Sequence, residues 1–331
     1  MNHWTASQLV PRQQGAALLM AMLTVALVST LASAALWQQW RQVEIEIAER
    51  GRSQTAWMMT GALDWSRLIL REDARSDQGA GVDHLAEPWA LPVQESKLST
   101  FLSQDQKWQE GDAEVFLSGQ ITDAQSRMNV MNLIEDGRVS PKMLAQFTAL
   151  FERLNLPLGE LQNLATQLLA SFQAKSDKAA NPSLATANTT ALMPQQTAQL
   201  VWLGLSARTL AALQPHITLL PEVTPLNLNT ASAEVLSASL PGLDLASARQ
   251  AVALRQRGHW PSLDAARKAL GAAGRQLEDR HHSIQSRYFE VHGRMRIDNV
   301  VHQEQTLVRR DGDQVSLVWR VKSPQQRLNT P

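Results

Sequence analysis

Residues 16–37 read AALLMAMLTVALVSTLASAALW, a run of 22 residues without a charged side chain, a proline or a glycine. As an α-helix this run would rise about 33 Å, enough to cross a membrane hydrocarbon core of about 30 Å. Charged residues are absent from the whole stretch between Gln13 and Trp40. The run therefore predicts a membrane-spanning helix or a signal sequence.

The apolar pattern continues beyond residue 37 with helical spacing. Apolar residues recur at intervals of three and four and would share one face of a helix: Leu36, Trp40, Val43, Ile47, Met58, Ala62, Trp65 and Ile69. No proline occurs between Pro11 and Pro88. We therefore expect one helix over residues 16–72 that starts in a membrane, with residues 16–37 as the spanning part, and ends packed on a globular domain.

Three interpretations of this N-terminus are open. It is a plain signal anchor, a cleaved secretory signal, or a pilin-type leader. Residues Ala32-Ser33-Ala34 fit secretory cleavage, which would leave Ala35 as the mature N-terminus. The pilin-type leader is indicated by VPRQQG, with Arg12 and Gly15, directly before the apolar run. A signal peptide has no reason to continue in phase as a long amphipathic helix, so the third interpretation is favoured.

On these residues the chain resembles the type IV pilin and pseudopilin superfamily. The resemblance implies that residues 1–15 are a leader, that prepilin peptidase cuts between Gly15 and Ala16, and that Ala16 is then N-methylated. Most members carry a glutamate at the fifth mature position, which here is Met20. A subunit without this carboxylate cannot pair with the N-terminus of one assembled ahead of it. The missing glutamate and the excess length resemble the K-type minor pseudopilins (GspK).

The remainder of the chain predicts an α+β fold. Residues 73–125 and 284–331 would form the two parts of a pilin-like domain, a small antiparallel sheet against the long helix. Alternating residues in AEVFLSGQITD and YFEVHGRMRI predict strands. A turn at Asp311-Gly312 predicts a hairpin whose second strand, QVSLVWRV at residues 314–321, has four apolar residues on one side: Val315, Leu317, Trp319 and Val321.

Between these parts lies a predicted all-α insertion. Residues 126–215 would form a helical domain, with Asn129 and Asn132 in a segment that resembles the start of the K-type insertion. Four helices are expected from punctuation by proline and glycine: Pro141–Arg153, Leu158–Ala174, Pro194–Leu203 and Ala207–Leu213.

Residues 216–283 resemble a helix-hairpin-helix subdomain, with LNLNTAS at the start and a hairpin at Pro241-Gly242. DNA-binding versions offer backbone N–H groups to a phosphate at this hairpin. Here Asp244 stands where a second glycine is usual, and we expect its carboxylate to cap the following helix and repel a phosphate. The nearby cations are Arg249, Arg255 and Arg257. Use in structure or protein contact is therefore favoured over DNA binding.

Composition argues against an enzyme. The chain has no cysteine, and 31 basic residues balance 31 acidic ones, which excludes thiolate chemistry and a global attraction to nucleic acid. Motifs for a nucleophile elbow, a phosphate loop or a zinc protease are absent from the sequence. The pair His281-His282 is expected at a solvated helix end.

Acidic residues gather in the loop after the long helix, which we expect to be a solvated acidic loop. No metal site is assigned and no cofactor is expected, but calcium remains open, and its candidate ligands are Asp73, Asp77 and Asp83.

The resemblance implies a non-enzymatic subunit that initiates and caps the tip of the periplasmic pseudopilus. The protein would be single-pass in the inner membrane with its globular part in the periplasm. Implied partners are the I-, J- and H-type minor pseudopilins, the major pseudopilin and prepilin peptidase, with secreted substrates and the secretin as further candidates. Assembly is expected along Val43, Ile47, Met58 and Trp65. The alternative is a membrane-anchored DNA-uptake protein that uses the helix-hairpin-helix.

Overall fold

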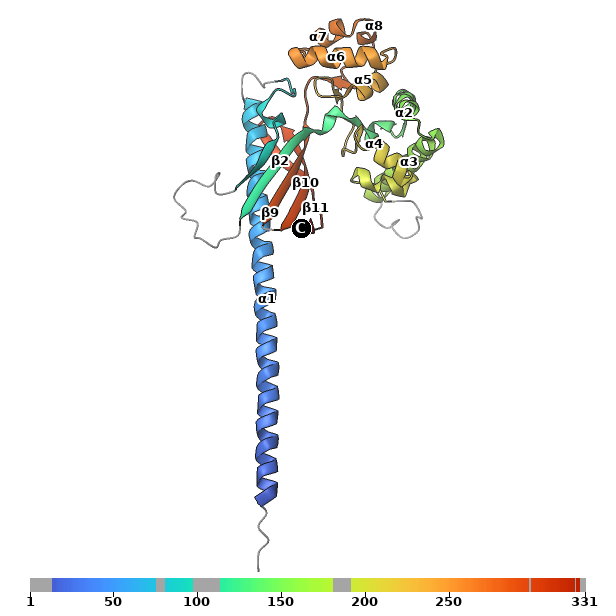
Figure 1. Cartoon of the computed structure of the whole chain (residues 1–331). Coiled ribbons are helices and arrows are strands. Elements are labelled where there is room, and N and C mark those ends of the chain that lie inside the picture. Colours follow the sequence, from blue (N-terminus) through green and yellow to red (C-terminus); the bar gives the residue numbers. More distant parts are fainter. Residues whose placement is uncertain are drawn as a thin grey trace, which may run out of the picture. The chain divides into compact units, whose positions relative to one another are not determined.

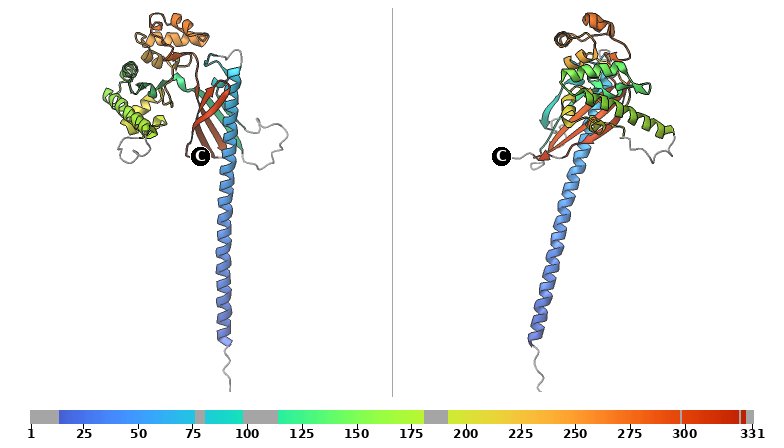
Figure 2. Two further views of the ribbon diagram at one scale, coloured as in Figure 1. Left: turned by 180° about the vertical axis from the view of Figure 1, so that it is seen from behind. Right: turned by 90° about the vertical axis from the view of Figure 1, so that its right-hand side faces the viewer.

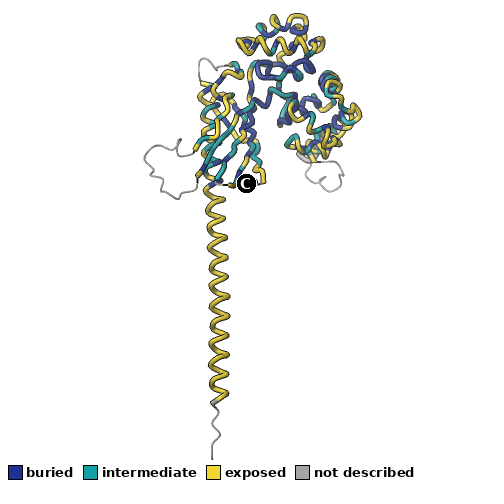
Figure 3. The backbone as a smooth tube through the Cα atoms, viewed as in Figure 1, coloured by how far each residue is buried: buried dark blue, intermediate teal, exposed yellow. Residues whose placement is uncertain are grey.

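The computed structural model describes residues 14–75, 81–97, 114–180, 192–297, 299–324 and 326–327. The chain forms two compact units, residues 1–60 and residues 61–331. Helix α1 spans Gln14–Arg75 without a break, so the predicted long N-terminal helix is confirmed. Residues 15–54 of this helix are exposed throughout, as the tube in Figure 3 shows.

The second unit is built on an antiparallel sheet in the order β1-β2-β9-β10-β11, with the short β12 also paired to β10. Strand β2 pairs with β9 from Val115↔Ile297 to Asp123↔Phe289, so strands far apart in sequence lie side by side (Figure 1). The predicted strands and the hairpin at Asp311-Gly312 are confirmed. The strand bounds are Val93–Lys97 (β1), Val115–Asp123 (β2), Tyr288–Ile297 (β9), Val300–Asp311 (β10), Gln314–Lys322 (β11) and Gln326–Arg327 (β12).

One face of this sheet packs on the last turns of α1. Leu63 and Leu70 of the helix join an apolar cluster with Phe289 and Val308 of the sheet. Trp89, on the short 3-10 helix η1 (Pro88–Ala90), completes this cluster edge-on to Phe289, with ring centroids 5.2 Å apart. Leucines at positions 63 and 70, rather than Trp65, therefore anchor the helix to the sheet.

The opposite face of the sheet carries a second cluster. Tyr288, Leu307 and Trp319 pack there with Ala124 and Leu220 from the inserted segment. The expectation that four apolar residues of β11 share one side is wrong. A bulge pairs Val308 with Leu317 but the neighbouring Leu307 with Trp319, so the alternation changes phase along β11.

The insertion is largely helical and forms its own core. The helices are α2 (Pro141–Arg153), α3 (Leu158–Ala180), η6 (Thr197–Leu203), α4 (Ala207–Leu213), α5 (Ala233–Ser239), α6 (Leu245–Arg257), α7 (Leu263–Ala269) and α8 (Gly271–Gly274). Short pieces connect them: η3 (Ala124–Ser126), β3 (Met128–Asn129), η4 (Val130–Leu133), β4 (Ile134–Glu135), β5 (Arg138–Val139), β6 (Ile217–Thr218), β7 (Leu226–Asn227) and β8 (His282–Ser283). Of the predicted helices, α2 and α4 are confirmed to the residue, α3 runs longer, and η6 is a 3-10 helix.

The starts of the helices follow from their sequences. A side-chain oxygen accepts a hydrogen bond from the backbone at the N-cap of α2, α4, α5, α6 and α7, and these caps are Ser140, Ser206, Ser232, Asp244 and Ser262. Asp244 accepts from Ser247 N at 2.8 Å, so the predicted cap of α6 is confirmed. Gly242 has φ +83°, which a side chain would strain, and this allows the tight turn between α5 and α6.

Candidate assembly face and polar junction

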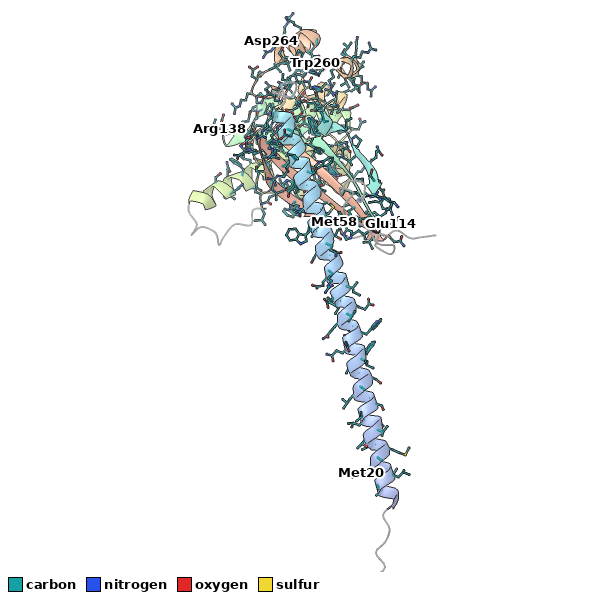
Figure 4. The ribbon with its side chains drawn as sticks, turned by 90° about the vertical axis from the view of Figure 1, so that its left-hand side faces the viewer. Met20, Met58, Glu114, Arg138, Trp260 and Asp264 are labelled. Atoms are coloured by element: carbon teal, nitrogen blue, oxygen red, sulfur yellow. The ribbon has the colours of Figure 1, made fainter. Side chains whose placement is uncertain are left out.

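The predicted assembly residues lie on α1 and stay accessible along most of it. Met20, Val43, Ile47 and Trp65 are between 46 and 69% exposed, and Met58 is half-buried. Figure 4 shows the side chain of Met20 standing away from the helix. This helix is also the one described segment long and apolar enough to cross a membrane. Exposed apolar residues in such numbers fit contact with lipid or with other helices, but their roles remain predictions.

The acidic residues after α1 form a buried cluster rather than a solvated loop, so that expectation is wrong for the described ones. Asp73, Asp83 and Glu87 are buried, with ligand atoms within 4.8 Å of one another. Asp77 lies outside the described residues. The cluster is closed because the chain after α1 folds back on the sheet, where Asp83 N donates to Ile284 O at 2.8 Å.

A guanidinium already binds two carboxylates of this cluster. Arg310 of β10 donates to Asp73 at 2.8 Å and also to Asp83, and it lies over the Phe289 ring. Burial raises the pKa of Asp73 and of Asp83, and Arg310 opposes that rise. Calcium bound here would have to displace Arg310, so the described carboxylates do not fit a calcium site while the guanidinium holds them.

Glu87 belongs to the same cluster but is held differently. Its Oε2 accepts from His84 N at 2.9 Å and from Trp89 Nε1 at 2.7 Å. Burial raises the pKa of Glu87 to about 7. Near neutral pH this carboxyl therefore changes its charge inside the fold.

A second buried carboxylate joins the sheet to the insertion. Asp123, at the end of β2, accepts hydrogen bonds from Gln125 N, Asn227 Nδ2, Thr230 Oγ1 and Ser286 Oγ at 2.5 to 2.9 Å. Burial raises the pKa of Asp123 to about 6, although these four donors favour the anion. The carboxylate ties the strand that leaves the sheet to the segment that returns to it.

Asn227 extends this network to the acidic cluster. Its Nδ2 also donates to the carbonyl of Asp83 at 3.1 Å, and Asp83 in turn accepts from Ser286 N at 2.7 Å. We call Asp83, Asp123, Asn227, Ser286 and Arg310 the polar junction. It connects the loop after α1, the sheet and the insertion through directional hydrogen bonds.

Two further asparagines clamp the insertion just beyond the junction. Asn132 donates to Thr224 O at 2.8 Å and accepts from Thr224 N at 3.1 Å, as a strand would. Asn129 donates to Glu222 O at 2.8 Å and accepts from Leu220 N at 3.0 Å. The segment that the sequence singled out at the start of the insertion therefore holds residues 220–224 in place.

The LNLNTAS motif also has structural partners. Asn229 exchanges hydrogen bonds with the backbone of Trp260, at 2.9 and 3.0 Å. Arg255 is buried and donates to the carbonyls of Leu228 and Ala231. Of the three arginines that the sequence offers for phosphate contact, this one points inward, and its pKa is lowered to about 10 by burial.

The pair His281-His282 is buried, so the expectation of a solvated helix end is wrong. His282 lies on β8, which pairs in parallel with β7 at Leu226. Burial lowers the pKa of His282 to about 4. The last residues of the insertion return as strand β8, where the imidazole of His282 is neutral near pH 7.

Sequence patterns did not identify the polar junction, because its members come from five places in the chain. The one signal was LNLNTAS, which we interpreted as the start of a hairpin module. Its first asparagine in fact belongs to the junction.

Comparison with known proteins agrees with this architecture. The family model described as "Type II secretion system (T2SS), protein K" matches residues 226–285, and a second model with that description matches residues 126–222. Type II secretion system protein K of Pseudomonas aeruginosa is 27% identical over 84% of this chain and 83% of its own length. The protein K of Klebsiella pneumoniae is 26% identical over 97% of both chains.

A solved structure shares the fold. It is a chain from the crystal structure of the GspK-GspI-GspJ complex from the type 2 secretion system of enterotoxigenic Escherichia coli. The match has a TM-score of 0.61 and 19% identity, and covers 84% of this chain and 98% of that one. The shared fold, the two family models and the full-length relatives together support the assignment of this chain as a K-type minor pseudopilin of the type II secretion system.

Proposed function

We propose that this protein is a non-enzymatic subunit that starts and caps the tip of the pseudopilus, the filament that drives export of folded proteins. It is anchored in the inner membrane by residues 16–37, with its globular part in the periplasm. The observation that carries this proposal is the exposed apolar side of α1 outside the membrane span, at Val43 and Ile47. An exposed apolar surface of this kind marks a site of contact with another protein or with a membrane.

The partners follow from the same surface. The relative from enterotoxigenic Escherichia coli was crystallised with GspI and GspJ, which supports I- and J-type subunits as the proteins that cover α1. Met20 replaces the glutamate usual in the superfamily, so this subunit needs no neighbour ahead of it. A bulky insertion is also tolerated at a filament end, where no further subunit stacks above it.

Site-specific photocrosslinking tests the assembly face. A benzophenone amino acid at Val43 or Ile47 is introduced in cells that make the I- and J-type subunits. The matched control is Arg52, which lies on the opposite side of α1 by helical geometry. We expect crosslinks to the I-type subunit from positions 43 and 47 and none from position 52. Equal yields from all three positions would contradict an assembly face.

Mass spectrometry of the mature chain tests the leader. Processing between Gly15 and Ala16 predicts an N-methylated Ala16 as the first residue. Cleavage by signal peptidase predicts Ala35, and that result would remove the pseudopilin assignment of the N-terminus. The unbroken course of α1 through residues 32–35 supports the first outcome.

We also infer that residues 226–270 form a helix-hairpin-helix module with a structural role. The inward position of Arg255 and the capping by Asp244 support this, since both remove groups that a phosphate would need. Binding of duplex DNA by the full chain at low salt distinguishes the alternatives. Saturable binding that weakens steeply with added salt would favour the DNA-uptake function instead.

A further inference from the structure

A groove separates the free edge of the sheet from the insertion. It has a volume of about 540 Å³ and lies between β11 on one side and helix α3 on the other, with Val318 and Phe172 on its two walls. The views in Figure 2 show the helical insertion standing beside the sheet. A volume of this size is in the range of ligand and peptide sites.

One wall of the groove is an edge strand. Among the described residues, β11 pairs with β10 alone, so its other edge has no strand partner. An edge of this kind presents unpaired backbone N–H and C=O groups and is a template for another extended chain. Addition of a strand at such an edge is a common mode of peptide recognition.

The lining of the groove is largely apolar and includes one buried hydrogen-bond donor. Phe172, Leu220 and Val318 supply apolar surface. The indole Nε1 of Trp319 is buried and has no hydrogen-bond partner in the part of the chain that the structure describes. A buried donor without an acceptor is unfavourable, so an acceptor on a bound chain that reaches this N–H would be stabilising.

The one charged side chain that lines the groove, among the described residues, is positive. Lys175 lines the groove, and the lining residues include no acidic side chain. Among the described residues Lys175 also makes no ion pair. A ligand that carries a carboxylate would therefore complement the groove, and a cationic ligand would not.

We propose that this groove binds an extended segment of another polypeptide that carries a carboxylate side chain. The segment adds to the free edge of β11, places apolar side chains against Phe172 and Leu220, and gives an acceptor to Trp319 Nε1. Its carboxylate pairs with Lys175. This inference concerns other residues than those of the assembly face of α1, and it stands whether or not the protein caps the filament.

Peptide binding to the full chain in lipid nanodiscs tests the proposal. The probe is a fluorescein-labelled eight-residue peptide of alternating valine and threonine with two glutamates, and its counterpart has lysine in place of glutamate. Anisotropy should show saturable binding of the glutamate probe and none of the lysine probe. The nitrogen–proton NMR signal of the Trp319 indole, assigned with Trp319→Phe, should shift on binding.

Variants locate the contacts. Trp319→Phe should lower the affinity for the glutamate probe about fivefold, which corresponds to the loss of one hydrogen bond. Lys175→Gln should lower this affinity at low salt but little at high salt. Val318→Asp places a competing carboxylate in the groove and should abolish binding. Leu317→Asp is the matched control, because Leu317 is exposed on the same strand but does not line the groove.

Each contrary outcome overturns the proposal. Lack of saturable binding at millimolar probe removes it, as does binding that Trp319→Phe and Val318→Asp leave unchanged. If dodecanoate shifts the Trp319 indole NMR signal and the peptide does not, the groove binds an amphiphile instead of a peptide. Dimerisation of the chain that Val318→Asp abolishes would assign it to a second copy.

Discussion

Replacement of Arg310 by methionine tests whether this residue is the cation of the acidic cluster. The change leaves Asp73 and Asp83 buried without the guanidinium that now bonds both of them, 2.8 Å away at Asp73, with Glu87 close by. Removing one partner of a buried ion pair costs about 3–5 kcal/mol. We expect Arg310→Met to lose that much free energy of unfolding at pH 7.5, a large part of a typical total of about 5–15 kcal/mol.

The neighbouring arginine supplies the control. Arg309 also pairs with carboxylates, Asp311 at 2.8 Å and Glu222 at 4.0 Å, but about a third of its side chain is exposed. Exposed pairs contribute about 0–1 kcal/mol. Urea unfolding followed by tryptophan fluorescence should therefore show Arg309→Met close to the wild type. If Arg310→Met loses no more than Arg309→Met, the cluster does not depend on its cation.

The pH dependence of the variant gives a second, independent readout. Without Arg310 the carboxyls of Asp73 and Asp83 have folded-state pKa values raised further above their unfolded values. A raised carboxyl pKa makes the folded state bind more protons, so stability rises as pH falls. Arg310→Met should accordingly recover stability between pH 7.5 and pH 5. Added calcium should stabilise this variant and not the wild type, because only the variant lacks the guanidinium that calcium would have to displace.

Three other changes have defined outcomes. Glu87→Gln should flatten the pH dependence of the free energy of unfolding between pH 4.5 and 7. The pKa of Glu87 is about 7 in the folded state and 4.5 in the unfolded state. Its stabilising contribution is therefore complete below pH 4.5 and is lost as the pH rises through 7. Arg255→Met should cost about 2–4 kcal/mol in urea unfolding by leaving two buried carbonyls unpaired, without any change in DNA binding. Gly15→Val should block removal of the leader, visible as the unprocessed mass of the full chain.

The sequence predicted the parts of the fold that depend on local patterns. Alternation located β2 and β9, and punctuation by proline and glycine located α2 and α4. The length of α1 followed from an apolar run that continues in phase without a proline. Each of these signals lies in one continuous stretch of sequence, so one sequence suffices to detect it.

Features that depend on partners far away in the chain were missed or misjudged. Helical spacing grouped Trp65 with the face expected to pack, yet Leu63 and Leu70 fill the core and Trp65 stays accessible. Helical periodicity shows which residues share one face of α1, but not which face packs against the sheet. The bulge at Leu307 and Val308 changed the phase of β11 for a similar reason, since register depends on the neighbouring strand.

The polar junction explains how a large insertion can sit on a small sheet in one orientation. Apolar contact between Leu220, Tyr288 and Leu307 is favourable but has little directional preference. Hydrogen bonds to Asp123 and Asn227 have narrow geometry, and a buried donor left unpaired is costly. A tilt of the insertion would break several of these bonds at once. These bonds stiffen the point where the chain leaves the sheet, so we expect Asp123→Asn to loosen the insertion. Spin labels at Gln167→Cys and Ser316→Cys, in a chain that has no other cysteine, should then give a broader distance distribution. An unchanged distribution would mean that the apolar contact alone sets the orientation.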